Sequence, residues 1–206
     1  MDHDAQVELL LRYLQAKRDA LLWKLEGLSE YDARRPLTPT GSNVLGIVKH
    51  VASVEHDYLS VCFGDPPAFP MPWNDSEEPN ADMYATAEES VTDIIGLYRT
   101  AWERDDASVR QRGLAATGQV PWWGERGQQV EMFWVLVHVL DETARHLGQV
   151  DILRESIDGQ AGVRPEGSNL PELDAQGWSS YVDMLEQIAR GTATFGSPPP
   201  PRRIRG

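Results

Sequence analysis

The sequence predicts an all-α protein: a four-helix bundle with a long crossover loop and a short C-terminal helix. Four segments of bundle length carry apolar residues at three- and four-residue steps, which is the period of an α-helix. A proline-rich stretch separates the second segment from the third. The chain shows no strand-like alternation and no hairpin signal that would compete with helix. Long helices joined by one long connection are typical of a bundle.

The first two helices follow from apolar spacing and from residues that end or begin a helix. The pattern predicts a first helix from Asp4 to about Leu28, with Gly27 near its end. A second helix is predicted from about Asn43 to Phe63. Either Ser42 or Asn43 could cap its first turn, because both side chains can accept a hydrogen bond from a free backbone N–H group.

A crossover loop is expected next, where "GDPPAFPMPWNDSEEPN" contains five prolines. The third helix is predicted from Thr86 to about Asp106, and the fourth and longest from about Gln128 to Ile157. The segment between these two helices is expected to be a loop. It contains Trp122 and Trp123, which are too apolar to lie fully in water without a reason.

The C-terminal part is predicted to contain a short helix and a tail. "WSSYVDMLEQIAR" has the helical period, whereas "GTATFGSPPPPRRIRG" ends in a proline run and basic residues. We therefore predict one helical domain over residues 1–191 and a flexible, Pro-rich tail over 192–206.

Composition narrows the function classes. The 206 residues carry a formal net charge of −13, so the surface as a whole repels nucleic acid. No stretch is long and apolar enough for a membrane span, and the N-terminus does not resemble a secretion signal. The single cysteine, Cys62, cannot form an intrachain disulfide, which agrees with a reducing compartment. We expect a cytoplasmic protein without nucleic acid or membrane partners.

Polar residues recur every four residues in the predicted fourth helix. His138, Glu142 and His146 share one face, because steps of four and eight residues drift only about 40° and 80° around a helix. Apolar residues cover most of the remaining circumference, so this row is expected to be buried and to need partners. On the second helix, His50 could supply a third ligand to a cation, whereas His56 lies about 120° away from it.

Two ordinary interpretations compete with a metal site. Glu and His four residues apart often form only a surface pair, which contributes a few tenths of a kcal/mol, roughly. A histidine on an apolar face is also often a core residue that is bonded to a carbonyl group. Spacing alone leaves these alternatives open.

The motifs "GSNVLGIVKHVASVEHDYL" and "VLVHVLDETARHLGQVDILRE" resemble the DinB-like superfamily of metal-binding four-helix bundles. The closer resemblance is to an actinobacterial branch of unknown function, related to mycothiol-dependent maleylpyruvate isomerases. It covers most of the chain and implies His50, Glu142 and His146 as metal ligands. Many members have His where this chain has Glu142, but the isomerases resemble this chain in having Glu.

Three further residues are candidates for a role beside the metal or the substrate. His138 could face the substrate or support a ligand, or it could be a core histidine. Arg145 could bind a substrate carboxylate or form an ion pair with Asp141 or Glu142. Asp57 could orient His50 or accept a proton, or it could be a surface charge. The two tryptophans could cover the pocket, although core packing or a dimer contact is the simpler interpretation.

The resemblance implies a metal-dependent, mycothiol-type thiol S-transferase or isomerase-like enzyme acting on a small molecule. The expected cofactors are a divalent metal, Zn or Ni, and a low-molecular-weight thiol as cosubstrate. Hydrolysis by a metal-bound water is the alternative within the enzyme class. A non-catalytic, metal-dependent ligand-binding or stress-response protein is the second class, and a cation that only stabilises the fold is the third. A homodimer is also expected.

Overall fold

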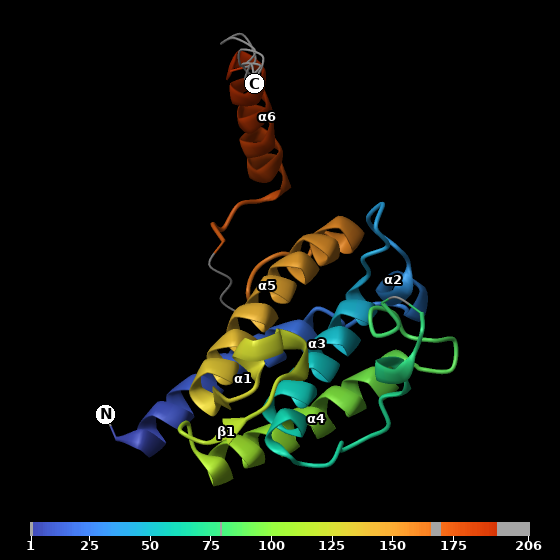
Figure 1. The fold of residues 1–206 in the computed structure, drawn as a ribbon. Coiled ribbons are helices and arrows are strands. Elements are labelled where there is room, and N and C mark those ends of the chain that lie inside the picture. The colour runs from blue at the N-terminus through green and yellow to red at the C-terminus, as the bar shows by residue number, and fades with distance from the viewer. Residues whose placement is uncertain (1, 79, 166–169, 193–206) are drawn as a thin grey trace, which may run out of the picture. The chain divides into compact units, whose positions relative to one another are not determined.

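A computed structural model describes residues 2–78, 80–165 and 170–192, and four long helices form a bundle in it (Figure 1). Helix α1 packs against α4 and α5, and α3 packs against the same two helices, which closes the ring. The predicted all-α bundle is confirmed. The four helices are α1 (His3–Trp23), α3 (Val44–Leu59), α4 (Val91–Arg112) and α5 (Met132–Asp158).

Helices α3 and α4 run in the same direction, opposite to α1 and α5 (Figure 1). The chain must therefore return from the end of α3 to its beginning, and residues 64–90 form this crossover, with a short 3₁₀ helix, η2 (Pro72–Asp75), within it. The returning segment is bonded to the start of α3, where Asn43 Nδ2 donates to the carbonyl of Met83 at 3.3 Å. Lys49 Nζ donates to the carbonyl of Tyr84 at 3.1 Å.

Capping residues set where the helices begin. The side chain of Asn43 accepts a hydrogen bond of 2.7 Å from the N–H of Gly46, so Asn43 is the cap of α3. Helix α4 begins later than predicted, at Val91, because Ser90 and Asp93 form a reciprocal capping box. It also ends later, where Gly113 adopts a φ of 75°.

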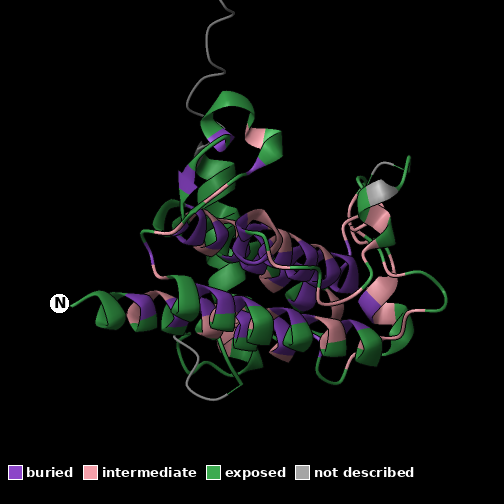
Figure 2. Cartoon of the chain, turned by 60° about the horizontal axis from the view of Figure 1, so that its bottom comes forward, coloured by how far each residue is buried: buried purple, intermediate pink, exposed green. Residues whose placement is uncertain are grey.

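The core lies along the inner faces of the four helices, where buried positions alternate with exposed ones (Figure 2). One apolar cluster fills the half of the bundle that contains Leu21, Val48 and Tyr98, and a second contains Leu14, Leu59 and Leu136. Burial of these side chains is the main term that stabilises the bundle.

Charged groups are also buried between the helices. Arg18 of α1 forms an ion pair with Glu55 of α3, and both side chains are fully buried. The Arg18 guanidinium also bonds Asp106 of α4 at 2.9 Å. The hydroxyl of Tyr98 donates to the second oxygen of Glu55 at 3.1 Å. This network ties α1, α3 and α4 together at one level of the bundle.

Several short elements were not expected from the sequence. A two-residue strand, β1 (Thr117–Gly118), pairs antiparallel with β2 (Val130–Glu131), which corrects the expectation that strands are absent. Such a short ladder leaves no alternating pattern, and it forms because tertiary contacts hold β1 beside η1 (Val61–Phe63) and β2 beside the start of α5. The other additions are helix α2 (Glu30–Arg34) and the 3₁₀ helix η3 (Pro121–Gly127).

The chain divides into two compact units, residues 1–168 and 169–206. The second contains helix α6 (Ala175–Thr192), which confirms the predicted C-terminal helix. The predicted tail, residues 192–206, lies outside the described residues except for Thr192 at the end of α6. That residues 1–191 form one domain stays a prediction.

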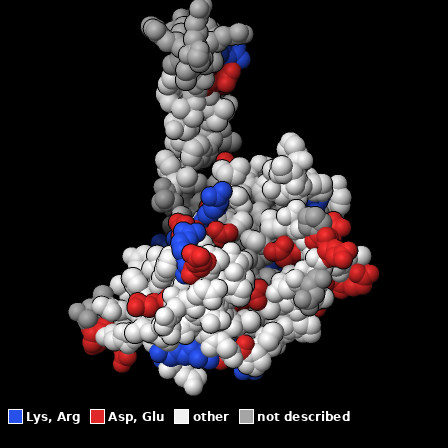
Figure 3. Space-filling model, viewed as in Figure 1, with Lys and Arg blue, Asp and Glu red and all other residues white. Residues whose placement is uncertain are grey.

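The surface reflects the acidic composition. Asp and Glu side chains gather in several places on the face shown in Figure 3, with smaller groups of Lys and Arg among them. None of the helices in the described part of the chain combines the length and the apolar character that a bilayer span requires.

Replacing Arg18 by Met should lower the free energy of unfolding by about 3–5 kcal/mol, because the buried Glu55 carboxyl would lose the partner that stabilises its charge. Urea denaturation, followed by circular dichroism, measures the change. Arg110→Met is the matched control, since Arg110 pairs with Glu8 in solvent and should contribute about 1 kcal/mol or less. Equal effects of the two changes would contradict a structural role for the buried network.

Candidate metal centre

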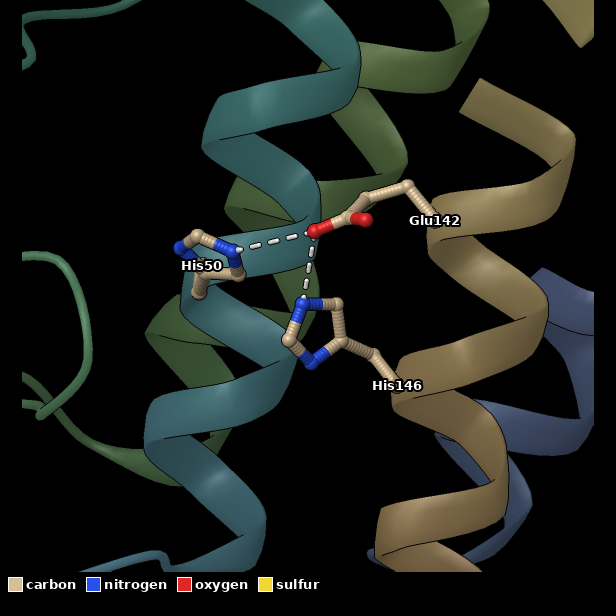
Figure 4. Close-up of side chains that lie close together, drawn as sticks. All are labelled: His50, Glu142 and His146. Carbon is tan, nitrogen blue, oxygen red and sulfur yellow. Dashed lines mark hydrogen bonds and ion pairs between the residues drawn. The ribbon is translucent and has the colours of Figure 1, made fainter. Parts of the chain in front are cut away.

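The packing of α3 against α5 brings three predicted ligands together, as Figure 4 shows. Glu142 and His146 project from successive turns of α5 towards His50 on α3. One oxygen of Glu142, Oε1, lies 2.9 Å from His146 Nε2 and 3.9 Å from His50 Nε2. We call these three residues the His–Glu–His cluster. Its side chains are mostly buried, with exposed fractions of 18% for His50, 29% for Glu142 and 10% for His146.

Each imidazole is oriented through its other ring nitrogen. His50 Nδ1 lies 2.6 Å from Oδ2 of Asp82, which the crossover carries to the start of α3. This hydrogen bond holds the pKa of Asp82 below its usual value. His146 Nδ1 lies 2.9 Å from Oε1 of Gln149, one turn further along α5. Both Nε2 atoms therefore face Glu142, an arrangement that proteins commonly use for metal-binding histidines.

The donor set fits a divalent cation. Two imidazoles and one carboxylate are typical ligands of zinc and of other divalent transition metals, and three protein ligands leave a position open. Neighbouring donor atoms of a tetrahedral zinc site lie about 3.3 Å apart. The separations of 2.9 and 3.9 Å bracket that value, and the three donor atoms lie within 4.8 Å of one another.

The hydrogen bonds of His146 are compatible with a role as a metal ligand. When Gln149 Oε1 accepts the Nδ1 hydrogen, the lone pair of Nε2 faces Glu142 Oε1 at 2.9 Å. A cation can then be bound by both atoms.

The cluster lies at the wall of a cavity of about 510 Å³, which we call the site pocket. Of the three cluster residues, Glu142 contributes to the wall. A cavity of this size holds a small molecule. The residues that line it are Val54, Asp57, Tyr58, Asn74, Trp122, His138 and Glu142.

The structure places His138 and Asp57 in this pocket. The His138 ring packs edge-on against Tyr58 and Trp123, at centroid distances of 5.0 and 4.9 Å. Asp57 accepts a hydrogen bond of 2.9 Å from Asn74. Burial raises the pKa of the Asp57 carboxyl, and the Asn74 bond opposes that shift. The carboxylate that orients His50 is Asp82 and not Asp57.

Arg145 lies elsewhere. It is exposed and lines a separate hollow on the surface of α5, together with Ser42 and Gln149. Within the described residues it forms no ion pair with Asp141 or Glu142, the partners that its spacing suggested. His56 is also remote from the cluster, as the helical angle predicts, and its Nδ1 lies 2.8 Å from buried Asp105.

Sequence reasoning missed Asp82 and Tyr58. Asp82 lies in an irregular segment, where no periodic pattern relates it to His50. Tyr58 fits the apolar spacing of α3, and that spacing by itself indicates only a residue that faces the core. Of the two tryptophans, Trp122 lines the pocket, whereas Trp123 packs against the core. The indoles of both donate to the Tyr58 hydroxyl, at 2.7 and 2.9 Å.

Fold and site together define a class of protein, a helical bundle with three side chains that could hold a divalent cation beside a pocket. The family model that matches this chain, described as Mycothiol-S-transferase, covers residues 9–159, from α1 to the end of α5. The chain therefore belongs to the mycothiol S-transferase family. This confirms the resemblance to the DinB-like superfamily and its mycothiol-dependent members. No curated protein matches the chain.

The thiol of Cys62 is poorly suited to be a nucleophile. Burial raises its pKa to about 12, and the Asp57 carboxylate adds to the shift. Very little thiolate is then present near neutral pH, and the thiolate is the reactive form. Cys62 also does not line the site pocket.

Cys62 should therefore react about 1000-fold more slowly with iodoacetamide at pH 8 in the folded protein than in urea, following the difference in thiolate fraction. Its rate in the folded protein should still rise about tenfold per pH unit, because the pKa lies well above this range. Mass spectrometry of quenched samples measures the labelled fraction, with Cys62→Ser as the unlabelled control. Rapid labelling of folded protein at pH 7 would contradict the raised pKa.

Proposed function

We propose that this protein is a metal-dependent S-transferase that joins the sulfur of a mycothiol-type thiol to an electrophilic small molecule. The observation that carries the proposal is the convergence of two imidazole Nε2 atoms on one Glu142 oxygen at the wall of the site pocket. The family supports the choice of thiol and favours transfer over isomerisation.

In this proposal His50, Glu142 and His146 hold a divalent cation, Zn or Ni. Such a cation supplies a positive charge that lowers the pKa of a bound thiol and so yields thiolate at neutral pH. Asp82 and Gln149 keep the two imidazoles oriented. A cytoplasmic location and a homodimer remain predictions from the sequence.

The pocket residues act on the substrate. His138 has no hydrogen bond to another described residue, and its ring is fixed by Tyr58 and Trp123, so its nitrogens are available to a ligand. Trp122 and Tyr58 form an apolar wall of the pocket, against which the apolar part of the substrate would pack. In the transfer, a carbon–sulfur bond forms, the thiol proton leaves to solvent or to His138, and the electrophile gives up its leaving group.

Purified protein loaded with Zn or with Ni should accelerate the conjugation of mycothiol with monochlorobimane, and removal of the metal by a chelator should abolish the acceleration. Fluorescence follows the conjugate, and a thiol assay measures how much mycothiol is consumed. One thiol consumed per product indicates transfer. Product formation without thiol loss would indicate an isomerase-like reaction, and saturable binding without turnover would favour a non-catalytic ligand-binding protein.

Elemental analysis should find near-stoichiometric metal in the native protein and none in His50→Ala or His146→Ala. Asp82→Asn should weaken metal affinity by about 10- to 100-fold, because it removes the carboxylate that orients His50. His3→Ala is the matched control, since His3 bonds the backbone of Leu114 away from the cluster. Metal that remains bound in both cluster variants would overturn the ligand assignment.

A further inference from the structure

The hydroxyl of Tyr58 has an unusual set of partners. Two indole N–H groups, from Trp122 and Trp123, donate to its oxygen at 2.7 and 2.9 Å. A phenolic oxygen accepts two hydrogen bonds at most, so its capacity as an acceptor is used. In the described part of the chain, no acceptor is bonded to its hydrogen. Tyr58 is 7% exposed and lines the site pocket, so a ligand there is the partner available to this hydrogen.

Three ring contacts fix the position of this donor. The Tyr58 ring packs edge-on against Trp122 and His138, at centroid distances of 5.1 and 5.0 Å, and tilted against Trp123 at 5.6 Å. A donor that is already oriented loses little entropy when it bonds a ligand. The rings of Tyr58, Trp122 and His138 give the pocket flat aromatic walls, which suit a planar substrate.

The charges of the lining select against anions. Asp57 and Glu142 contribute carboxylates, and neither Lys nor Arg is among the residues that line the site pocket. Arg145, the candidate for binding a substrate carboxylate, lines the other hollow. Even with a divalent cation and a thiolate in place, the lining carries more negative than positive charge. A carboxylate on the electrophile would therefore be repelled.

We propose that the electrophile is an uncharged, aromatic-sized molecule with a hydrogen-bond acceptor, and that Tyr58 donates its hydroxyl hydrogen to that acceptor. This inference rests on the proposed transferase function. Asp57 is the residue that discriminates against anionic electrophiles. Negative charge collects on the acceptor atom of the electrophile as sulfur adds to it. The fixed hydroxyl of Tyr58 stabilises this charge by donating a hydrogen bond.

Two aryl chlorides that differ by one carboxylate test the inference, 2-chloro-1,3-dinitrobenzene and 4-chloro-3,5-dinitrobenzoate. In both reactions with mycothiol a carbon–sulfur bond forms, the carbon–chlorine bond breaks, chloride leaves with its electron pair, and the thiol proton passes to solvent. Negative charge collects on nitro oxygens during the addition. Each enzymatic rate is divided by the uncatalysed rate with the same thiol, which removes the difference in intrinsic reactivity.

The wild-type protein should accelerate the uncharged chloride at least tenfold more than the anionic one. Tyr58→Phe should lower kcat/KM for the uncharged chloride by about 100-fold and leave the bound metal unchanged. Tyr13→Phe, at an exposed tyrosine of α1, is its control.

Asp57→Asn should reduce the difference between the accelerations of the two chlorides by about tenfold. Asp141→Asn is the control and should leave this difference unchanged, because Asp141 is exposed on α5 and does not line the site pocket.

Binding provides a readout that does not need turnover. Saturation-transfer NMR should show stronger binding of 1,3-dinitrobenzene than of 3,5-dinitrobenzoate, neither of which has a chloride to lose. Asp57→Asn should increase binding of the benzoate. If this preference holds but mycothiol is not transferred to either chloride, the transferase proposal is wrong and the ligand class stands.

Equal or greater acceleration of the anionic chloride would overturn the substrate class while leaving the transferase function intact. Full activity of Tyr58→Phe on the uncharged chloride would overturn the role of the Tyr58 hydroxyl.

Discussion

The packing of α3 against α5 is the contact on which the site depends. Along this one interface His50 meets Glu142 and His146, and about two turns of α3 further on Tyr58 meets His138. A shift between the two helices would disturb the cluster and the aromatic wall of the pocket together. Apolar side chains pack closely above and below the polar row and hold α3 and α5 at a fixed position relative to each other. A closely packed core resists small shifts of one helix along another, because each shift would open voids or cause clashes.

The parallel arrangement of α3 and α4 explains the chemistry around the interface. Because the chain must return along the bundle, the crossover passes the start of α3 and supplies Asp82 to His50, and it also supplies Asn74 to Asp57. A tight antiparallel turn between these helices would leave both without a partner. The long connection is therefore part of the site, and its irregular backbone carries polar side chains that no bundle helix offers at these positions.

Helix α3 also carries a second polar system, directed towards other helices. Glu55 pairs with Arg18 in the bundle interior, and His56 pairs with Asp105 of α4, while His56 Nε2 accepts a hydrogen bond of 2.9 Å from the N–H of Ala68 in the crossover. These groups are bonded to one another, although Oδ2 of Asp105 is buried without a hydrogen-bond partner in the described part of the chain, and none of them lines the site pocket. They fix α3 relative to its neighbours. The polar groups of α3 that face the site pocket have fewer hydrogen-bond partners, and the hydroxyl hydrogen of Tyr58 in particular remains available to a ligand.

The sequence by itself determined the helices and three members of the site. Apolar spacing located all four bundle helices and the C-terminal one, and the four-residue step placed Glu142 and His146 on one face, because a helix converts spacing directly into direction. Resemblance selected His50. Only the tertiary structure decided that Asp82, and not Asp57, orients His50, that Arg145 lies outside the pocket, and that β1 and β2 pair. These outcomes depend on the path of the irregular segments and on contacts between residues far apart in the chain, and neither leaves a periodic signal.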